Sequence, residues 1–198
     1  MSRGVVWVAF GDKALECVRF AKESVEDACP GLDTYTLTTR PRVEIVDDVS
    51  LSRWAKLTLL EWSPFESTAY LDADTRVYKS LSPGFEAIES GWDIAIAPSQ
   101  NQREDDWLWH VDFGDRLLTI NSLQFRALQL QAGVMFVARN DRTYEFFSAW
   151  REEWSAFHNQ DQAALLRALY RVPVKIWLLG RPWNGGSVIG HRFGDLKV

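Results

Sequence analysis

The sequence predicts an α/β fold: a single domain with a mixed, mostly parallel central sheet flanked by helices. Two observations indicate it. Short apolar runs, rich in β-branched residues, alternate with amphipathic helical segments from the first residues onward. No internal repeat and no linker-like segment divides the 198 residues, and 46% of them are hydrophobic, so one sizeable core is expected.

Strands and helices alternate in the N-terminal half. Residues 13–28 carry alanine, leucine and valine at helical spacing. A second helix is expected to begin at a serine cap, Ser50 or Ser52, and to run to about Trp62. Apolar runs predict strands at 5–9, 34–38, 43–46 and 68–71.

The C-terminal half continues the alternation less regularly. Helices are predicted near 85–89, 141–157 and 160–170, and strands at 92–98, 132–138 and 174–179. Residues 99–124 show no clear period and are predicted to form a long functional loop with some helix. The glycine-rich tail from Arg181 onward is predicted to be loop.

Charge and composition exclude several classes of protein. The net charge of -5 argues against a general nucleic-acid binder, although residues 142–198 hold 8 basic against 5 acidic side chains and could face an anionic ligand. Two cysteines without CxxC spacing form no disulfide framework. No apolar run approaches the ~18 residues of a membrane span, so we expect a cytoplasmic protein without membrane insertion.

An aspartate pair, Asp72 and Asp74, follows the strand predicted at 68–71. Residues at i and i+2 of an extended segment point the same way, so both carboxylates can reach one cation. Without a cation the like charges would repel, and a hard divalent ion prefers such oxygen ligands. Aspartate is also a common turn residue, so an exposed turn is the structural alternative.

Two further groups of residues could carry chemistry. His191 lies in the glycine-rich tail, where it could complete a metal site, although a single histidine is more often structural. Gly194 and Lys197 follow it, and such residues allow close approach of backbone and charge to phosphate. Asp161 and Gln162 begin a predicted helix, where aspartate could reach into a cleft or simply favour the positive helix end.

Five sequence blocks occur in order along the chain: VAFGD (Val8–Asp12), KLTLLEWSPFESTAYLDADTRV (Lys56–Val77), LQAGVMFVARN (Leu130–Asn140), NQDQAALL (Asn159–Leu166) and GHRFGDLK (Gly190–Lys197). Together these blocks resemble the GT-A nucleotide-sugar glycosyltransferases, most closely the family 8 group that includes glycogenin-like and galactosyltransferase-like enzymes. The resemblance spans nearly the whole chain, and it implies a Rossmann-like GT-A domain.

The resemblance implies a role for each matching residue. Asp72 and Asp74 match the metal-binding DxD motif, and His191 matches the third metal ligand; the ion would be Mn²⁺ or Mg²⁺. Asp161 and Gln162 match the residues beside the anomeric carbon. The residues that match donor contacts, to the uridine, the sugar or the diphosphate, are Phe10, Asp12, Lys56, Gly133, Gly194 and Lys197.

The implied activity is transfer of a sugar from a nucleotide-diphosphate sugar, a UDP-sugar, to a hydroxyl acceptor with retention at the anomeric carbon. Residues 1–98 would form the nucleotide-binding half and residues 99–198 the half that holds donor sugar and acceptor. Gln131 departs from the asparagine of many relatives. The acceptor could be a glycan, a protein, a small molecule or a modified DNA base, and Trp107, Trp109 and His110 are candidates to contact it.

Two other functions remain open at this point. LDADTRV also fits a haloacid-dehalogenase-type phosphatase, with Asp72 as nucleophile and Asp74 as acid and base. That signature normally follows the first strand, whereas here further strands and helices are predicted ahead of it. That fold also needs a later Gly-Asp element to hold Mg²⁺, and the only late candidate is Gly194-Asp195. A non-catalytic nucleotide-binding module is the third interpretation.

Overall fold

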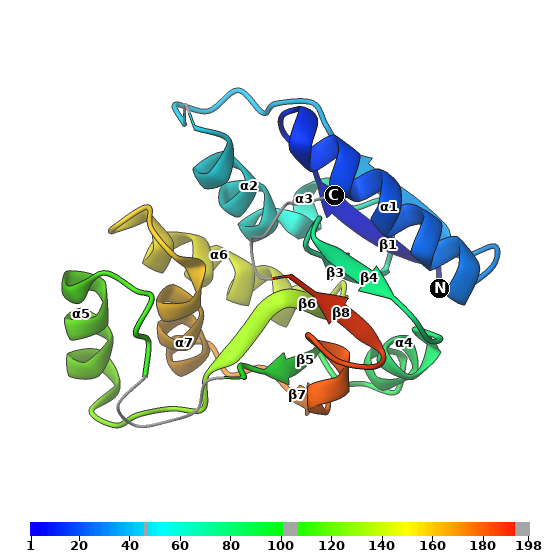
Figure 1. The fold of residues 1–198 in the computed structure, drawn as a ribbon. Helices are drawn as coiled ribbons and strands as arrows, with labels where there is room; N and C mark the ends of the chain where they lie inside the picture. The colour runs from blue at the N-terminus through cyan, green and yellow to red at the C-terminus, as the bar shows by residue number, and fades with distance from the viewer. Residues whose placement is uncertain (46, 101–106, 193–198) are drawn as a thin grey trace.

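The computed structural model describes residues 1–45, 47–100 and 107–192 (Figure 1). Its centre is a six-stranded sheet with the order β2-β1-β3-β6-β5-β7. Strand β6 runs antiparallel to both neighbours, whereas the other pairings are parallel, which confirms the predicted mixed α/β sheet. The strands are β1 (Arg3–Val8), β2 (Asp33–Leu37), β3 (Ser67–Leu71), β5 (Ile94–Pro98), β6 (Leu130–Ala138) and β7 (Ile176–Leu178).

Helices cover both faces of this sheet, and a short two-stranded sheet lies beside it. The helices are α1 (Asp12–Ala28), α2 (Asp48–Leu57), α3 (Leu59–Trp62), α4 (Ser82–Glu89), α5 (Phe113–Leu123), α6 (Asp141–Ser155), α7 (Asp161–Arg171) and the 3-10 turn η1 (Arg181–Trp183). The small sheet pairs β4 (Thr75–Val77) with β8 (Ile189–His191). No helix in the described ranges combines the length and the apolar character of a membrane span.

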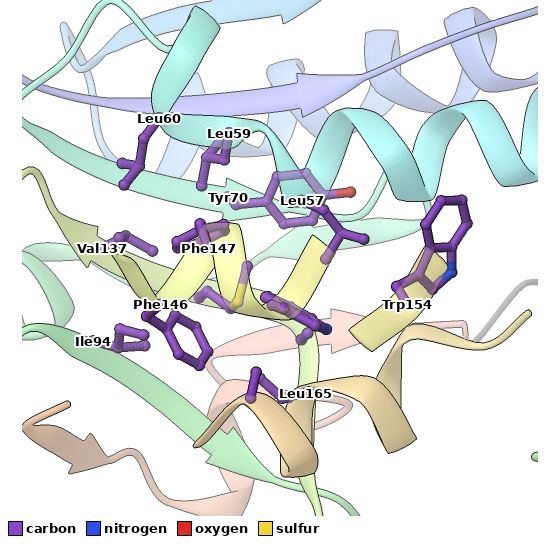
Figure 2. Close-up of a cluster of buried hydrophobic side chains, with 14 of the residues drawn as sticks. Leu57, Leu59, Leu60, Tyr70, Ile94, Val137, Phe146, Phe147, Trp154 and Leu165 are labelled. Atoms are coloured by element: carbon purple, nitrogen blue, oxygen red, sulfur yellow. The ribbon is translucent and has the colours of Figure 1, made fainter. Parts of the chain in front are cut away.

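The central sheet divides the core into two buried clusters because successive strand side chains point to opposite faces. Val6 and Val8 of β1 face the cluster formed with α2, α3, α6 and α7, in which Phe146 and Leu165 lie (Figure 2). Val5 and Trp7 face the cluster formed with α1 and α4. Burial on both faces explains why β1 reads as a continuous apolar run.

The strand predicted at 43–46 is wrong. Val43 donates its backbone N–H to the carbonyl of Pro41 at 3.0 Å, and residues 42–44 form a bend. Val43 and Ile45 pack against the core from this irregular segment, and residue 46 lies outside the described residues. A short apolar run shows that side chains are buried but not which backbone conformation buries them.

The serine cap predicted for the second helix is also wrong. Asp47 caps α2, and its side chain accepts the backbone N–H of Ser50 at 2.8 Å. Ser52 lies inside the helix and donates its hydroxyl to the carbonyl of Asp48. Aspartate and serine are equivalent caps, so the choice depends on where the chain enters the helix.

The glycine-rich tail is not entirely loop, contrary to prediction. Residues 189–191 form β8, which pairs antiparallel with β4 and sets Thr75 opposite His191. Three residues are too few to show a period of two, so sequence patterning indicated neither strand. The segment 99–124 contains α5, which confirms the expected helix within it, and residues 101–106 lie outside the described residues.

Candidate active site

The site is built where β1 and β3 end. Asp72 and Asp74 directly follow β3, and Phe10 and the start of α1 follow β1, as expected for an α/β sheet whose ligands bind beyond the strand ends. The pairing of β8 with β4 returns the C-terminal region to this edge and places His191 beside both aspartates. One ligand atom from each of the three side chains lies within 4.8 Å of the others.

The His191 ring is held by a hydrogen bond on one nitrogen and faces the carboxylates with the other. Its Nε2 lies 3.2 Å from Oδ1 of Asp74 and 3.6 Å from Oδ2 of Asp72. Its Nδ1 lies 2.6 Å from Oδ1 of Asn184. The Asn184 amide nitrogen donates to the carbonyl of Gln131, so its oxygen must face the ring. We infer that Nδ1 carries the proton and that Nε2 presents a lone pair to the two aspartates.

Gly133 of β6 leaves the space in which His191 and Asp72 meet. A Cβ on this glycine would lie 2.3 Å from Cε1 of His191 and 2.5 Å from Oδ2 of Asp72. The Gly133 carbonyl also accepts the backbone N–H of Asp72 at 2.8 Å, which fixes the turn after β3. The register between β5 and β6 shifts at Ile96 and Ala97, and such irregularities bend strands beside functional sites.

These three side chains could hold a divalent cation. Two carboxylates and one imidazole nitrogen form a donor set that Mn²⁺ accepts, and the two like charges are otherwise unfavourable at this separation. The orientation of His191 and the space at Gly133 both fit a cation shared by the three groups.

Lys56 of α2 links Asp72, one of the three candidate metal ligands, to Asp161 at the start of α7. Its Nζ lies 2.9 Å from Oδ2 of Asp161 and 3.2 Å from Oδ1 of Asp72. Burial alone would lower the pKa of Lys56, but the charges of Asp161 and Asp72 outweigh it and raise that pKa, so the ammonium stays charged. Burial likewise acts to raise the pKa of Asp161, but the charge and hydrogen bond of Lys56 lower it overall.

Tyr70 supports the same carboxylate from the end of β3. Its hydroxyl donates to Oδ1 of Asp72 at 2.9 Å, and its ring lies 5.2 Å from Nζ of Lys56. Burial and the negative charge of Asp72 raise the pKa of Tyr70, so its hydroxyl keeps its proton and remains a donor. The aspartate is therefore oriented by two groups that sequence patterning did not connect to it.

We expect Lys56→Met to destabilise the protein by about 3–5 kcal/mol, because Asp161 would remain as a buried, unpaired charge. Urea denaturation measures this loss. The exposed Lys22 on α1 gives a matched control, and Lys22→Met should change the free energy of unfolding by less than about 0.5 kcal/mol. Adding Asp161→Asn to Lys56→Met should recover part of the loss. A single variant as stable as the control would contradict this account.

Gln162 is buried at the start of α7 and keeps an unused donor. Its side chain is 5% exposed, and its Nε2 has no hydrogen-bond partner among the residues that the structure describes. Both Gln162 and Asp161 line the cleft. Because a buried amide without a partner is costly, its N–H is a candidate to bind a ligand.

A cleft of about 1010 Å³ joins these groups, at the upper end of the usual size for small-molecule sites. At the β1 end of the cleft, Gly11 precedes α1 with φ 84°. Because Gly11 has no Cβ, the carboxylate of Asp48 can lie beside it. Asp48 also lines the cleft, and sequence reasoning did not identify it. The sequence-predicted residues that line the cleft are Phe10, Asp12, Lys56, Asp72, Asp74, Trp109, His110, Asp161, Gln162 and His191.

Other predicted residues lie elsewhere. Gly133 contributes to the site because it has no side chain, which leaves room for the side chains of Asp72 and His191. Trp107 is buried, its Nε1 donates to the carbonyl of Ala127, and its side chain does not line the cleft. Gly194 and Lys197 lie outside the described residues. Asn184 gave no sequence signal, since it acts on the site only through His191.

Comparison with known proteins gives no matching family model and no matching curated protein. Solved structures do match. The galactosyltransferase LgtC, as an active-site glutamine-to-glutamate mutant, shares 16% identity over 91% of this chain and 74% of its own, with a TM-score of 0.63. Mouse xyloside xylosyltransferase 1 shares 11% identity with full coverage of both chains and a TM-score of 0.64.

A third match is a glycosyltransferase involved in glycosylation of the major capsid of PBCV-1. It shares 14% identity over 98% of this chain and 94% of its own, with a TM-score of 0.61. At these identities the likeness concerns the arrangement of strands and helices. The chain has the fold of the GT-A glycosyltransferases.

Proposed function

We propose that this protein is a metal-dependent glycosyltransferase, related most closely to family 8, that moves a sugar from a UDP-sugar to a hydroxyl acceptor with retention. One observation carries the proposal: Asp72, Asp74 and His191 converge at the strand ends of a GT-A fold, on the wall of a cleft of suitable size. Residues 1–98 would bind the nucleotide, and residues 99–198 would hold the donor sugar and the acceptor.

The three converging residues would hold Mn²⁺ or Mg²⁺. When bound, the ion would act as a Lewis acid that stabilises the charge of the departing diphosphate. Phe10 and Asp12, at the β1 end of the cleft, would lie against the uridine. Gly194 and Lys197 are assigned to the diphosphate by their match to the family motif, and Lys56 would hold Asp72 and Asp161 at fixed separation through its two ion pairs.

Asp161 and Gln162 would act at the donor sugar. Asp161 keeps its negative charge in the buried pair with Lys56, and this charge favours the positive charge that develops on the anomeric carbon. The unused N–H of Gln162 can donate to a sugar hydroxyl. Nζ of Lys56 donates a hydrogen bond to one carboxylate oxygen of Asp161, which makes this carboxylate a poor nucleophile. Direct attack by the acceptor from the donor's own face is favoured instead.

A screen of UDP-, GDP- and other sugar nucleotides for Mn²⁺-dependent hydrolysis tests the proposal. The expected result is release of a nucleoside diphosphate from one donor, abolished by a chelator and restored by Mn²⁺. Phosphate release from simple phosphomonoesters, lost in Asp72→Asn and without action on any sugar nucleotide, would instead establish the phosphatase alternative. Tight donor binding without turnover in the presence of acceptors would favour the non-catalytic module.

We expect Asn184→Leu to weaken Mn²⁺ binding by about 10–100-fold, because partners that orient a ligating histidine typically contribute that much to metal affinity. Calorimetric titration of Mn²⁺ measures the change. Asn184→Asp keeps an oxygen acceptor for Nδ1 of His191 and should retain most of the affinity. Asn121→Leu, an exposed substitution on α5, is the control. Equal affinities in Asn184→Leu and the control would refute the orienting role.

A further inference from the structure

Two tryptophans, two residues apart, have opposite environments beside the cleft. Trp107 is 5% exposed, and its Nε1 donates to the carbonyl of Ala127 at 3.0 Å. Trp109 is 60% exposed and lines the cleft. In a cleft lined by both polar and apolar groups, this exposed aromatic ring offers a flat surface on which a ligand can pack.

The backbone at Leu108 produces this arrangement. Leu108 has φ 52°, a left-handed conformation that a leucine rarely adopts. Its side chain is fully buried, and its backbone N–H donates to Oε1 of Gln129 at 3.2 Å. Trp107, Leu108 and Val111 form a buried cluster with Leu123, Ala163 and Leu166, which belong to α5 and α7. The strained turn is therefore held by packing on both sides, and the exposure of Trp109 is part of the fold.

Several of the groups that line the cleft together with Trp109 can form hydrogen bonds. The His110 ring meets the indole edge to face, with centroids 5.6 Å apart. Burial lowers the pKa of His110, although a hydrogen bond to Gln162 and the charge of Asp161 act the other way, so the imidazole is neutral near pH 7. Gln162 adds its unused N–H, and Gln160 lies nearby in the lining, bonded to Arg53 at 3.0 Å.

An open aromatic ring that shares a cleft with hydrogen-bonding groups matches the chemistry of a sugar. A pyranose ring offers a C–H face that packs on an aromatic ring and hydroxyl groups around its rim that bond to amides and imidazole. An apolar ligand such as an acyl chain would form no hydrogen bonds with the imidazole of His110 or the amides of Gln160 and Gln162, and it would leave the unused N–H of Gln162 without a partner. A saccharide satisfies both parts of the surface.

We infer that Trp109 and His110 form the acceptor site and that the acceptor is a saccharide, a conclusion that rests on the proposed function. A hydroxyl oxygen of the bound saccharide attacks the anomeric carbon of the donor, and a new C–O bond forms. The bond from that carbon to the diphosphate oxygen breaks, and its electron pair leaves with the nucleoside diphosphate. The hydroxyl proton passes to the departing phosphate oxygen.

Binding of saccharides to protein loaded with UDP and Mn²⁺ tests this inference. The probes are a glycan array, followed by saturation-transfer NMR with the glycans that it selects. We expect a saccharide to bind, Trp109→Ala to weaken its binding by about tenfold or more, and Trp109→Phe to keep most of it, as for stacking on a ring. Trp177, 46% exposed on β7 and outside the cleft lining, gives the control variant Trp177→Ala.

Hydrolysis of the donor without acceptor separates this test from the test of the proposed function. In Trp109→Ala, transfer to the saccharide should fall relative to donor hydrolysis, whereas Trp177→Ala should keep the wild-type ratio of the two rates. If donor is hydrolysed but no saccharide binds, or if Trp109→Ala binds the saccharide as well as wild type does, the inference is wrong. Transfer to a peptide or a DNA base that is unaffected in Trp109→Ala would also overturn it. Loss of donor hydrolysis in the wild type would contradict the proposed function instead.

Discussion

Asp74→Asn is expected to abolish Mn²⁺-dependent binding of the nucleotide while the protein still melts cooperatively. Asp74 is 6% exposed, and its Oδ1 lies 3.2 Å from Nε2 of His191. The substitution keeps the size of the side chain but removes the charge that a divalent ion requires. Affinity for Mn²⁺ should fall by more than about 100-fold, since loss of a group that merely orients a ligand already costs 10–100-fold.

Calorimetry with UDP and Mn²⁺ measures this effect, and Asp141→Asn is a matched control. Asp141 is an exposed aspartate at the start of α6, outside the cleft lining. Its substitution should leave metal and nucleotide affinities within about a factor of two, because exposed substitutions change free energies by only about 0.5 kcal/mol. If Asp74→Asn kept the wild-type Mn²⁺-dependent affinity for UDP, the assignment of Asp74 as a ligand would be wrong.

Asp72, Asp74 and His191 could be proposed together as metal ligands from the sequence only through the family resemblance. Spacing alone placed Asp72 and Asp74 on one side of a strand end, but it could not bring His191 to them. The structure joins the three residues through β4 and β8, strands of three residues each, which are too short to produce a recognisable pattern. Asn184 remained hidden because its effect depends on a single contact with the His191 ring.

Length and burial explain which elements the sequence could predict. Helix α1, with 17 residues, and strand β6, with nine, repeat their pattern often enough to be recognised. The run at 43–46 is as apolar as a strand, yet Val43 and Ile45 pack against the core from a segment that is not a strand. Pairing depends on distant partners, which a local pattern does not contain.

Trp107 and Trp109 show the same limit at the level of single side chains. Both were candidates to contact an acceptor, and two residues of the same type in one segment cannot be told apart by composition. The left-handed turn at Leu108 determines which of them is buried. That turn is stabilised by contacts with α5 and α7, and therefore by the tertiary structure.

Gly133→Ala is expected to destroy the proposed metal site without replacing any of its ligands. The new methyl group would lie 2.3 Å from Cε1 of His191 and 2.5 Å from Oδ2 of Asp72, closer than real contacts allow. Movement of either side chain separates the three donor atoms, which now lie within 4.8 Å of one another. Overpacking of this kind costs about 1–3 kcal/mol of stability, so the variant should fold and melt at a lower temperature.

Thermal melting with and without Mn²⁺ separates loss of the metal site from loss of stability. At a Mn²⁺ concentration of about 100 times Kd, the wild type should gain about 2.7 kcal/mol, whereas Gly133→Ala should gain almost nothing. Gly114→Ala is the control, because its added Cβ would meet only Phe157 Cε1, at 3.4 Å, and neither Gly114 nor Phe157 lines the cleft. A stabilisation of Gly133→Ala by Mn²⁺ equal to that of the control would mean that the space beside Gly133 is not required for the metal. If Mn²⁺ does not stabilise Gly133→Ala, this variant should also lose Mn²⁺-dependent donor hydrolysis. The same three side chains would hold the ion during melting and during hydrolysis.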